Sequence, residues 1–253
     1  MKNTDWIIIP DVHGRRFWRK AVQGHEDERI VFLGDYLDPY QREEITPGDS
    51  YRELRDIIAF KKAHPDNVVL LLGNHDLGYL DQSVCSCRRD IFGYDRNRRL
   101  LESNLDLFDL VHETDIDETK VLFSHAGIRQ EWVRYNDWLF CGGDFDPLVL
   151  NSMLHEPSLR DDLMLALSQV SLYRGGYDPV GSPVWADANE LMDSGDFLPG
   201  YLHVFGHTAH KGGPVLIRTE QGDGWCMDCA DAFRMDRTGQ VRYLDYEENN
   251  SQI

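Results

Sequence analysis

The sequence lacks both an excess of positive charge and any long hydrophobic run. Its 253 residues include 26 Lys and Arg against 44 Asp and Glu, which gives a formal net charge of −18 at pH 7. Proteins that bind nucleic acids or anionic membranes depend on clustered Lys and Arg, so this charge disfavours both classes. A transmembrane helix needs a run of about 18 apolar residues, and no such run is present. We therefore expect neither a nucleic-acid partner nor a membrane partner.

Signals for export and for disulfide bonding are also scarce. The stretch MKNTDWIIIPDVHG has three isoleucines as its apolar core, against the roughly 7–15 apolar residues of a signal peptide, which predicts a cytoplasmic protein. The cysteine count of five is odd, and a chain of this size does not need covalent staples, so reduced thiols are expected. The motifs CSC and CMDC could together form a four-thiolate zinc site, but the CxC half lacks the usual spacing.

The sequence also lacks internal repeats, low-complexity tracts and long linkers rich in proline or glycine. Its hydrophobic content of 42% is that of a globular protein, and its length suits one large core. We predict a single domain over residues 1–245 and a flexible tail over residues 246–253. Two polar, turn-rich segments, 39–49 and 175–182, are predicted to be long loops over one face.

Hydrophobic periodicity predicts a mixed α/β fold. Strands are expected at residues 6–9, 29–33, 68–72, 121–124, 202–205, 215–217, 225–227, 232–235 and 241–244. Helices are expected at residues 51–62, 97–107 and 147–172. The first half of the chain alternates strand and helix, which is typical of α/β sheets, whereas the last fifty residues are mostly short strands.

Five of the predicted strands end at polar side chains, nearly always with a glycine nearby. The strand in NVVLLLGNHDLGYL ends at Asn74, His75 and Asp76. The other four strands end at Asp11 and His13, at Asp35 and Asp38, at His125, and at His207. In open α/β sheets, ligands bind beyond the carboxyl ends of the strands. These side chains are therefore predicted to meet at one site.

The donors at these strand ends suffice for two divalent metal ions. Two imidazoles and a carboxylate can hold one ion, but at least six candidate ligands are present, and Asp35 has two oxygens with which to bridge. Such a set suits two ions about 3.5–4 Å apart, with a bridging hydroxide as the nucleophile. Nitrogen and oxygen ligands without thiolate favour Mn, Fe, Zn or Co over Ca or Mg. We take manganese first, with iron, zinc or cobalt as alternatives.

In this order, the motifs DxH, GDxxD, GNHD, SHAG and GHT resemble the calcineurin-like metallophosphoesterase superfamily. The likeness is to its phosphoprotein phosphatase branch, which includes serine/threonine protein phosphatases and bacterial diadenosine polyphosphate hydrolases. It spans residues 11 to about 236 and implies a four-layer β-sandwich flanked by helices. The resemblance implies that Asp11, His13 and Asp35 bind the first metal, and that Asp35, Asn74, His125 and His207 bind the second. It also implies that His75 acts near the leaving group and is held by Asp38.

The chemistry of phosphate-ester hydrolysis needs the same parts. A metal pair neutralises phosphoryl oxygens and lowers the pKa of bound water towards about 7. The departing alkoxide still needs a proton, which His75 can supply if Asp38 holds its imidazole in the correct tautomer. Asp76 is expected instead to accept backbone N–H bonds within its own loop.

The sequence departs from the superfamily pattern at its phosphate-clamping arginines. Many relatives have an arginine after GDYVD, whereas GDYLDPYQREE has Pro39 there, and a second family arginine is replaced in GSPVWADANEL. Nearby options in the sequence are Arg15, Arg42 and Arg174, of which we rank Arg174 first as a substrate-binding residue. His210 is out of register with the GHxH motif of many relatives, and we expect it to be solvated or to lie behind the ligands.

The predicted function is a dinuclear metal-dependent phosphoesterase. Its substrate is predicted to be a phosphoprotein or a phosphorylated small molecule such as a nucleotide or a dinucleoside polyphosphate. Loss of the clamping arginines lowers the expectation of a phosphoprotein. The alternative is a non-catalytic scaffold that retains the phosphatase fold as a partner-binding surface. Such a scaffold would be expected to have lost metal ligands, and none of the ligand positions is lost here.

Overall fold

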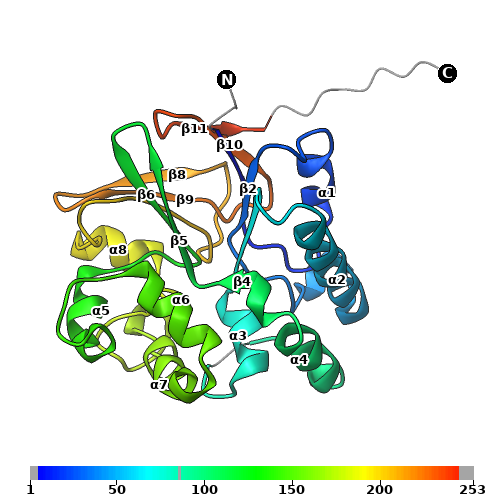
Figure 1. Ribbon diagram of the computed structural model, residues 1–253, viewed down its shortest axis with the longest axis horizontal. Helices are drawn as coiled ribbons and strands as arrows, with labels where there is room; N and C mark the ends of the chain where they lie inside the picture. The colour runs from blue at the N-terminus through cyan, green and yellow to red at the C-terminus, as the bar shows by residue number, and fades with distance from the viewer. Residues whose placement is uncertain (1–4, 85–86, 245–253) are drawn as a thin grey trace.

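Two β-sheets form the centre of the computed structural model, which describes residues 5–84 and 87–244 (Figure 1). The first sheet has the strand order β11-β10-β1-β2-β3-β4, and the second has the order β5-β6-β7-β9-β8. Helices α1, α2 and α4 lie on one side of the sheets, and α5, α6, α7 and α8 lie on the other (Figure 1). This mixed α/β arrangement of two sheets flanked by helices confirms the predicted fold class.

The elements follow one another along the chain, with longer connections between α3 and α4 and between α7 and α8. The strands are β1 (Trp6–Ile9), β2 (Arg29–Phe32), β3 (Val68–Leu71), β4 (Phe108–Asp109), β5 (Val111–Ile116), β6 (Thr119–Ser124), β7 (Leu202–Phe205), β8 (Val215–Arg218), β9 (Asp223–Cys226), β10 (Phe233–Met235) and β11 (Val241–Tyr243). The α-helices are α1 (Phe17–Val22), α2 (Pro47–Ala63), α3 (Asn74–Leu80), α4 (Tyr94–Glu102), α5 (Gln130–Tyr135), α6 (Pro147–His155), α7 (Pro157–Leu167) and α8 (Ala188–Ser194).

The strands β1, β2 and β3 are parallel and buried on both faces, which explains their unbroken apolar sequences. Side chains alternate between two cores, because successive residues of a strand point to opposite faces. Ile7 and Ile9 enter the core beneath the helices. Ile8 enters the core between the two sheets, where it is joined by Phe123 of β6 and Val204 of β7. The second sheet therefore packs against the face of the first that the helices leave uncovered.

Several element predictions were wrong in their bounds, among them the helix predicted over 97–107, which is α4 and ends at Glu102. The helices α1, α3, α5 and α8 and the strands β4 and β5 were not predicted. The helix predicted over 147–172 is two helices, α6 and α7, because Pro157 has no N–H to continue α6 and begins α7 instead. The predicted loop 39–49 ends early, since Thr46 caps α2 and exchanges hydrogen bonds with Asp49. The strand β5 was missed because its central residues, HETD, are polar and half-buried or exposed, and pairing with β6 forms it.

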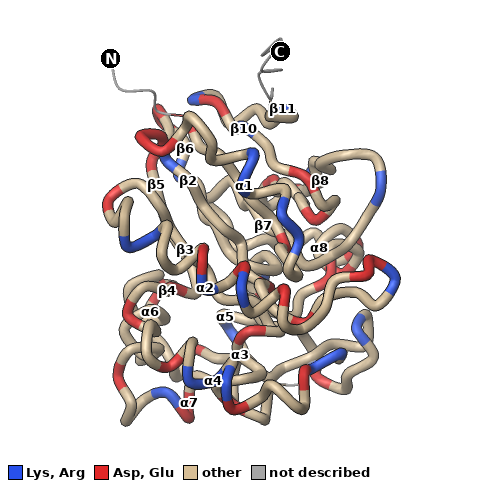
Figure 2. The backbone as a smooth tube through the Cα atoms, turned by 90° about the vertical axis from the view of Figure 1, so that its right-hand side faces the viewer, with Lys and Arg blue, Asp and Glu red and all other residues tan. Residues whose placement is uncertain are grey.

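Charge and hydropathy are distributed as the composition predicts. Figure 2 shows Asp and Glu on many loops and helix ends of the described chain, with Lys and Arg interspersed among them. None of the helices in residues 5–84 and 87–244 has an apolar stretch sufficient to cross a membrane. The predicted tail, 246–253, lies outside the described residues, and the single domain over 1–245 stays a prediction.

His203 on β7 is a buried histidine away from the strand ends, and it makes stability depend on pH. Its Nε2–H donates to the carbonyl oxygen of Leu198 at 2.8 Å, and its ring stacks on Phe197. Burial lowers the pKa of His203 to about 4. Below its ordinary pKa near 6.5, the unfolded chain binds a proton that the folded chain does not. Stability is therefore lost as the pH falls from that value towards about 4.

We expect His203→Gln to lose less stability on acidification than the wild-type protein. Between about pH 7 and about pH 4, the wild-type protein should lose about 3 kcal/mol more of its free energy of unfolding than His203→Gln. Urea unfolding at both pH values measures it. The comparison variant is His155→Gln, at an exposed histidine whose Nε2 lies 3.7 Å from Oδ1 of Asp109, and it should change the acid sensitivity much less than His203→Gln does. Identical acid sensitivity in the wild-type and His203→Gln proteins would show that His203 does not carry this effect.

Candidate metal centre

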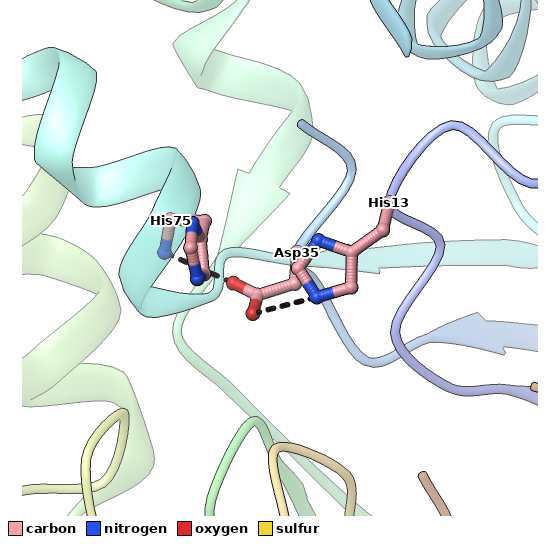
Figure 3. Close-up of side chains that lie close together, drawn as sticks. All are labelled: His13, Asp35 and His75. Atoms are coloured by element: carbon pink, nitrogen blue, oxygen red, sulfur yellow. Dashed lines mark hydrogen bonds and ion pairs between the residues drawn. The ribbon is translucent and has the colours of Figure 1, made fainter. Parts of the chain in front are cut away.

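The polar strand ends of both sheets meet at one buried site. Loops after β1 and β2, the start of α3 after β3, and the ends of β6 and β7 carry its side chains. All six predicted metal ligands are buried, from 0% exposed for His125 to 8% for His207. Figure 3 shows His13, Asp35 and His75 converging from three of these segments. The fold therefore brings together side chains that are nearly 200 residues apart in the sequence, such as Asp11 and His207.

Asp35 lies between two groups of possible metal ligands. Its Oδ2 lies 3.5 Å from Nε2 of His13 and 3.5 Å from Nε2 of His125. One group that could hold an ion consists of His13, Asp35 and His75, and the other consists of Asp35, His125 and His207. The other carboxylate oxygen of Asp35, Oδ1, accepts the backbone N–H of His75 at 3.0 Å. Asp35 is therefore the residue that the two groups share.

Two imidazoles are oriented by backbone carbonyls so that their outer nitrogens face the site. Nδ1 of His13 lies 2.7 Å from the carbonyl oxygen of Leu37, and Nδ1 of His125 lies 2.8 Å from that of Leu33. A carbonyl can only accept, so Nδ1 carries the proton in each ring. Nε2 of both rings is then left with a free lone pair, as in histidines that bind metals.

Polar atoms of Asn74 and His207 lie close to the ring of His125. Its Nε2 lies 3.1 Å from Oδ1 of Asn74 and 3.1 Å from Nδ1 of His207. Nε2 of His207 is buried and has no hydrogen-bond partner among the described residues. A buried polar atom without a partner is costly, and a cation could accept lone pairs from all three side chains at the same place. The donor set therefore fits divalent metal ions.

Glycines allow the carboxylates to approach these ligands. A Cβ atom on Gly73 would lie 2.1 Å from Oδ1 of Asp35, and one on Gly206 would lie 2.1 Å from Oδ1 of Asp11. Oδ1 of Asp11 accepts the backbone N–H of His207 at 2.9 Å, which joins the end of β1 to the end of β7. Asp11 thus lies beside His207, although neither of the two three-residue groups includes it.

Backbone strain is concentrated at the same positions. His13, Asp35, Asp38 and His207 have φ angles of 45°, 51°, 56° and 63°. This left-handed region costs a residue other than glycine about 1 kcal/mol or more, and such strain tends to collect at functional sites. The loops are therefore held in conformations that the residues would not adopt by themselves.

Burial keeps the histidines of the site in the neutral form that binds metals. It lowers the pKa of His13 and of His207 well below the ordinary value, so both imidazoles are neutral, as a metal ligand must be. Burial and then the charge of Asp11 raise the pKa of Asp35. Asp228, which sequence reasoning missed, is also buried, and its pKa is raised first by burial and then by Asp11. Cations would relieve this gathering of carboxylates.

His75 and Asp38 form a hydrogen-bonded pair at the edge of the site. Nδ1 of His75 lies 2.8 Å from Oδ2 of Asp38. Oδ1 of Asp38 accepts the hydroxyl of Tyr79 at 2.5 Å. Burial raises the pKa of Asp38 to about 7, and burial followed by the charge of Arg88 lowers the pKa of His75. Nε2 of His75 is therefore the nitrogen left to face a bound molecule.

Asp76 does what its position in the sequence predicted. Its Oδ2 accepts the N–H of Gly73 at 3.0 Å, and its Oδ1 accepts the N–H of Tyr36 at 3.0 Å. The first bond confirms the predicted role within its own loop. The second bond ties that loop to the one after β2, which holds Asp35 and Asp38 near α3.

The arginines proposed from the sequence are either paired with a carboxylate or exposed at the surface. Nη2 of Arg174 donates to Oγ1 of Thr208 at 2.8 Å and to the carbonyl oxygen of His207 at 3.2 Å, and its Nε lies 2.8 Å from Oδ2 of Asp187. Arg15 is paired with Glu43 at 2.7 Å, and Arg42 is exposed. Arg174 therefore reaches the edge of the site, but with part of its charge neutralised.

The tertiary contacts of two further residues, Arg88 and His210, show how each lies relative to the site. Arg88, in the segment before α4, has its Nη2 3.4 Å from Nε2 of His75. It was missed because it lies 13 positions beyond His75 in a segment without any recognisable motif. His210 contacts the carbonyl oxygens of Thr208 and Gly213 through its two ring nitrogens, at 3.0 and 2.7 Å, so it turns away from the ligand groups.

Solved structures with a similar fold include phosphatases. A cold-active protein-tyrosine phosphatase from a psychrophilic Shewanella species has a TM-score of 0.59 and 16% identity, and the match covers 96% of this chain and 81% of that one. Another structure of a cold-active protein tyrosine phosphatase has a TM-score of 0.56 and 16% identity, covering 96% and 79% of the two chains. At this identity the likeness shows the fold alone. A comparison with curated protein sequences gave no match.

The sequence itself matches a family model. Residues 7–211 match the family described as calcineurin-like phosphoesterase, and this range contains every predicted ligand and the pair of His75 and Asp38. Members of this family are metal-dependent, in agreement with the His and Asp groups at the strand ends. The chain therefore belongs to the calcineurin-like phosphoesterase family of metal-dependent phosphate-ester hydrolases.

Proposed function

We propose that this hydrolase uses two metal ions, with a hydroxide bridging them as nucleophile and His75 as the acid that protonates the leaving group. The observation that carries the proposal is the place of Asp35, whose Oδ2 lies at the same distance, 3.5 Å, from Nε2 of His13 and of His125. A carboxylate shared in this way supports a pair of ions that both use it.

The ligand assignment differs from the two groups around Asp35, because it takes Asp11 in place of His75 for one ion and adds Asn74 for the other. We assign Asp11, His13 and Asp35 to the first ion, and Asp35, Asn74, His125 and His207 to the second. Bound ions would neutralise phosphoryl charge and supply hydroxide at neutral pH. The donors are nitrogen and oxygen without thiolate, which supports manganese first and iron, zinc or cobalt as alternatives.

The leaving group is assigned to the side of the site occupied by His75. Its Nδ1 is engaged by Asp38, so in the protonated ring the proton to be transferred would be the one on Nε2. Asp38 fixes the tautomer and stabilises the protonated imidazole. A phosphate dianion beside the ring would raise its pKa, opposing the effects of burial and of Arg88.

The substrate is proposed to be larger than phosphate itself, either a phosphoprotein or a nucleotide-like small molecule. Two segments that reach the site carry exposed apolar side chains. Ile91 and Phe92 are 80% and 105% exposed on the segment that follows Arg88. Leu172 and Tyr177, near Arg174, are 75% and 97% exposed. These side chains offer contact area for an apolar or aromatic part of a substrate.

Hydrolysis of p-nitrophenyl phosphate with and without added Mn²⁺ tests the proposed reaction. We expect turnover that depends on metal, is abolished by a chelator and accompanies about two bound ions per chain. No turnover above a His75→Ala control with any of manganese, zinc, iron or cobalt would contradict the proposal and favour a non-catalytic scaffold. Profiling with phosphopeptides, dinucleoside polyphosphates and mononucleotides then identifies the substrate class.

A further inference from the structure

Arg88 places a guanidinium directly beside the outer nitrogen of His75. Its Nη2 lies 3.4 Å from Nε2 of His75, the nitrogen that faces a bound molecule. Its Nε donates to the carbonyl oxygen of Asp38 at 3.3 Å. The side chain therefore contacts both members of the pair formed by His75 and Asp38, although it comes from a separate segment of the chain.

The guanidinium of Arg88 has no carboxylate within ion-pair distance in the part of the chain that the structure describes. The other arginines near the site differ in this respect. Arg15 is paired with Glu43, and Arg174 lies against Asp187. In a protein with a formal net charge of −18, a half-buried arginine without a carboxylate in ion-pair contact is available for an anion from outside.

The position of Arg88 is held by contacts that, among the described residues, engage its terminal nitrogens only with Sγ of Cys87 and Nε2 of His75, at 3.8 and 3.4 Å. The central carbon of its guanidinium lies 3.8 Å from the centre of the Tyr40 ring, within cation–π range. The Tyr40 ring in turn packs edge-on against His13, with 5.0 Å between ring centres. Arg88 also has a left-handed backbone, with a φ of 65°. The guanidinium is therefore oriented before any ligand binds, which lowers the entropic cost of binding.

We propose that Arg88 is a substrate-binding residue that holds a phosphoryl oxygen beside His75. This inference rests on the proposed function, because it takes Nε2 of His75 to face the leaving group. Arginine suits this task because its planar fork of N–H groups matches the oxygens of phosphate. The residue complements the metal ligands, since it lies on the side of His75 and supplies positive charge there independently of any ion.

The test compares Arg88→Ala and Arg88→Lys with Arg98→Ala, using inorganic phosphate as the probe. Arg98 lies on α4 and pairs with Glu102 at the surface, so its replacement removes the same charge at a distance from the site. Calorimetry measures the Kd of phosphate for metal-loaded protein, and kinetics measure KM and kcat for p-nitrophenyl phosphate. Metal content and the melting temperature of each variant show whether the site and fold are intact.

We expect Arg88→Ala to raise the Kd of phosphate by about 10–100-fold, the usual effect of losing a charged hydrogen bond. Arg88→Lys should recover part of this loss, because it keeps the charge without the fork. Arg98→Ala should bind phosphate as the wild type does. The metal content should not change in any variant.

The Arg88 assignment would be overturned if Arg88→Ala bound phosphate as tightly as Arg98→Ala, or if the metal-loaded wild type bound no phosphate. If Arg88→Ala did not fold, the same comparison would be made with Arg88→Lys, and an unchanged Kd there together with an unchanged KM would reject the assignment. A wild type that binds phosphate through Arg88 but hydrolyses no ester would instead reject the proposed reaction and leave the binding role standing.

Discussion

Replacing Asp35 by asparagine is expected to weaken metal binding more than any other single ligand substitution. Asp35 is the one residue common to both ligand groups, and the amide would remove the negative charge that both cations share. Substitutions of residues that only support ligands cost about 10–100-fold in metal affinity, so we expect a loss of more than about 100-fold here. Metal content after dialysis and turnover at limiting metal concentration measure the effect.

The same variant should fold normally without metal. Burial and the nearby Asp11 raise the pKa of Asp35, so the metal-free protein gains little from a charge at this position. An asparagine oxygen can still accept the backbone N–H of His75. The matched control is Asp66→Asn, at an exposed aspartate, which should bind metal as the wild type does. An Asp35→Asn protein with both metals and a near-normal rate would show that Asp35 is not the bridge.

His75→Ala should keep its metals and lose activity in proportion to how much the leaving group needs a proton. On an alkyl phosphate we expect a loss of roughly 10²–10⁴-fold, the usual contribution of a positioned acid. A p-nitrophenolate leaves with little protonation, so the loss on p-nitrophenyl phosphate should be much smaller. Rates on both substrates and metal content, measured on the same preparations, test this prediction.

Asp38→Asn should show a weaker form of the same substrate preference. The amide would keep the side chain near Nδ1 of His75, but it could no longer stabilise a protonated ring. Metal analysis is decisive for His75 because its side chain also lies within reach of His13 and Asp35. Loss of a metal from His75→Ala, or equal losses on the two substrates, would mean that His75 is a ligand or a positioning group instead of an acid.

Much of the fold could be predicted because the signals for it are local. The apolar stretches of β1, β2 and β3 are continuous, since these strands are covered on both faces. Each is followed by the polar residues and glycines of a tight turn. The break between α6 and α7 was also visible as Pro157, and the single predicted helix gave too little weight to its missing N–H. The strand β5 carries no such local signal, because only pairing with β6 makes its polar residues a strand.

The amino-acid sequence alone determined which chemical groups end the strands, and therefore that carboxylate, imidazole and amide donors gather at one edge of the sheets. Parallel strands deliver their carboxyl ends to a common edge, so a local pattern is enough for that conclusion. Only the tertiary structure decided how those groups are arranged. It placed Asp35 midway between His13 and His125, paired Arg174 with Asp187, and brought Arg88 to His75. These relations depend on distances between segments far apart in the chain, and no periodicity or motif within one segment records them.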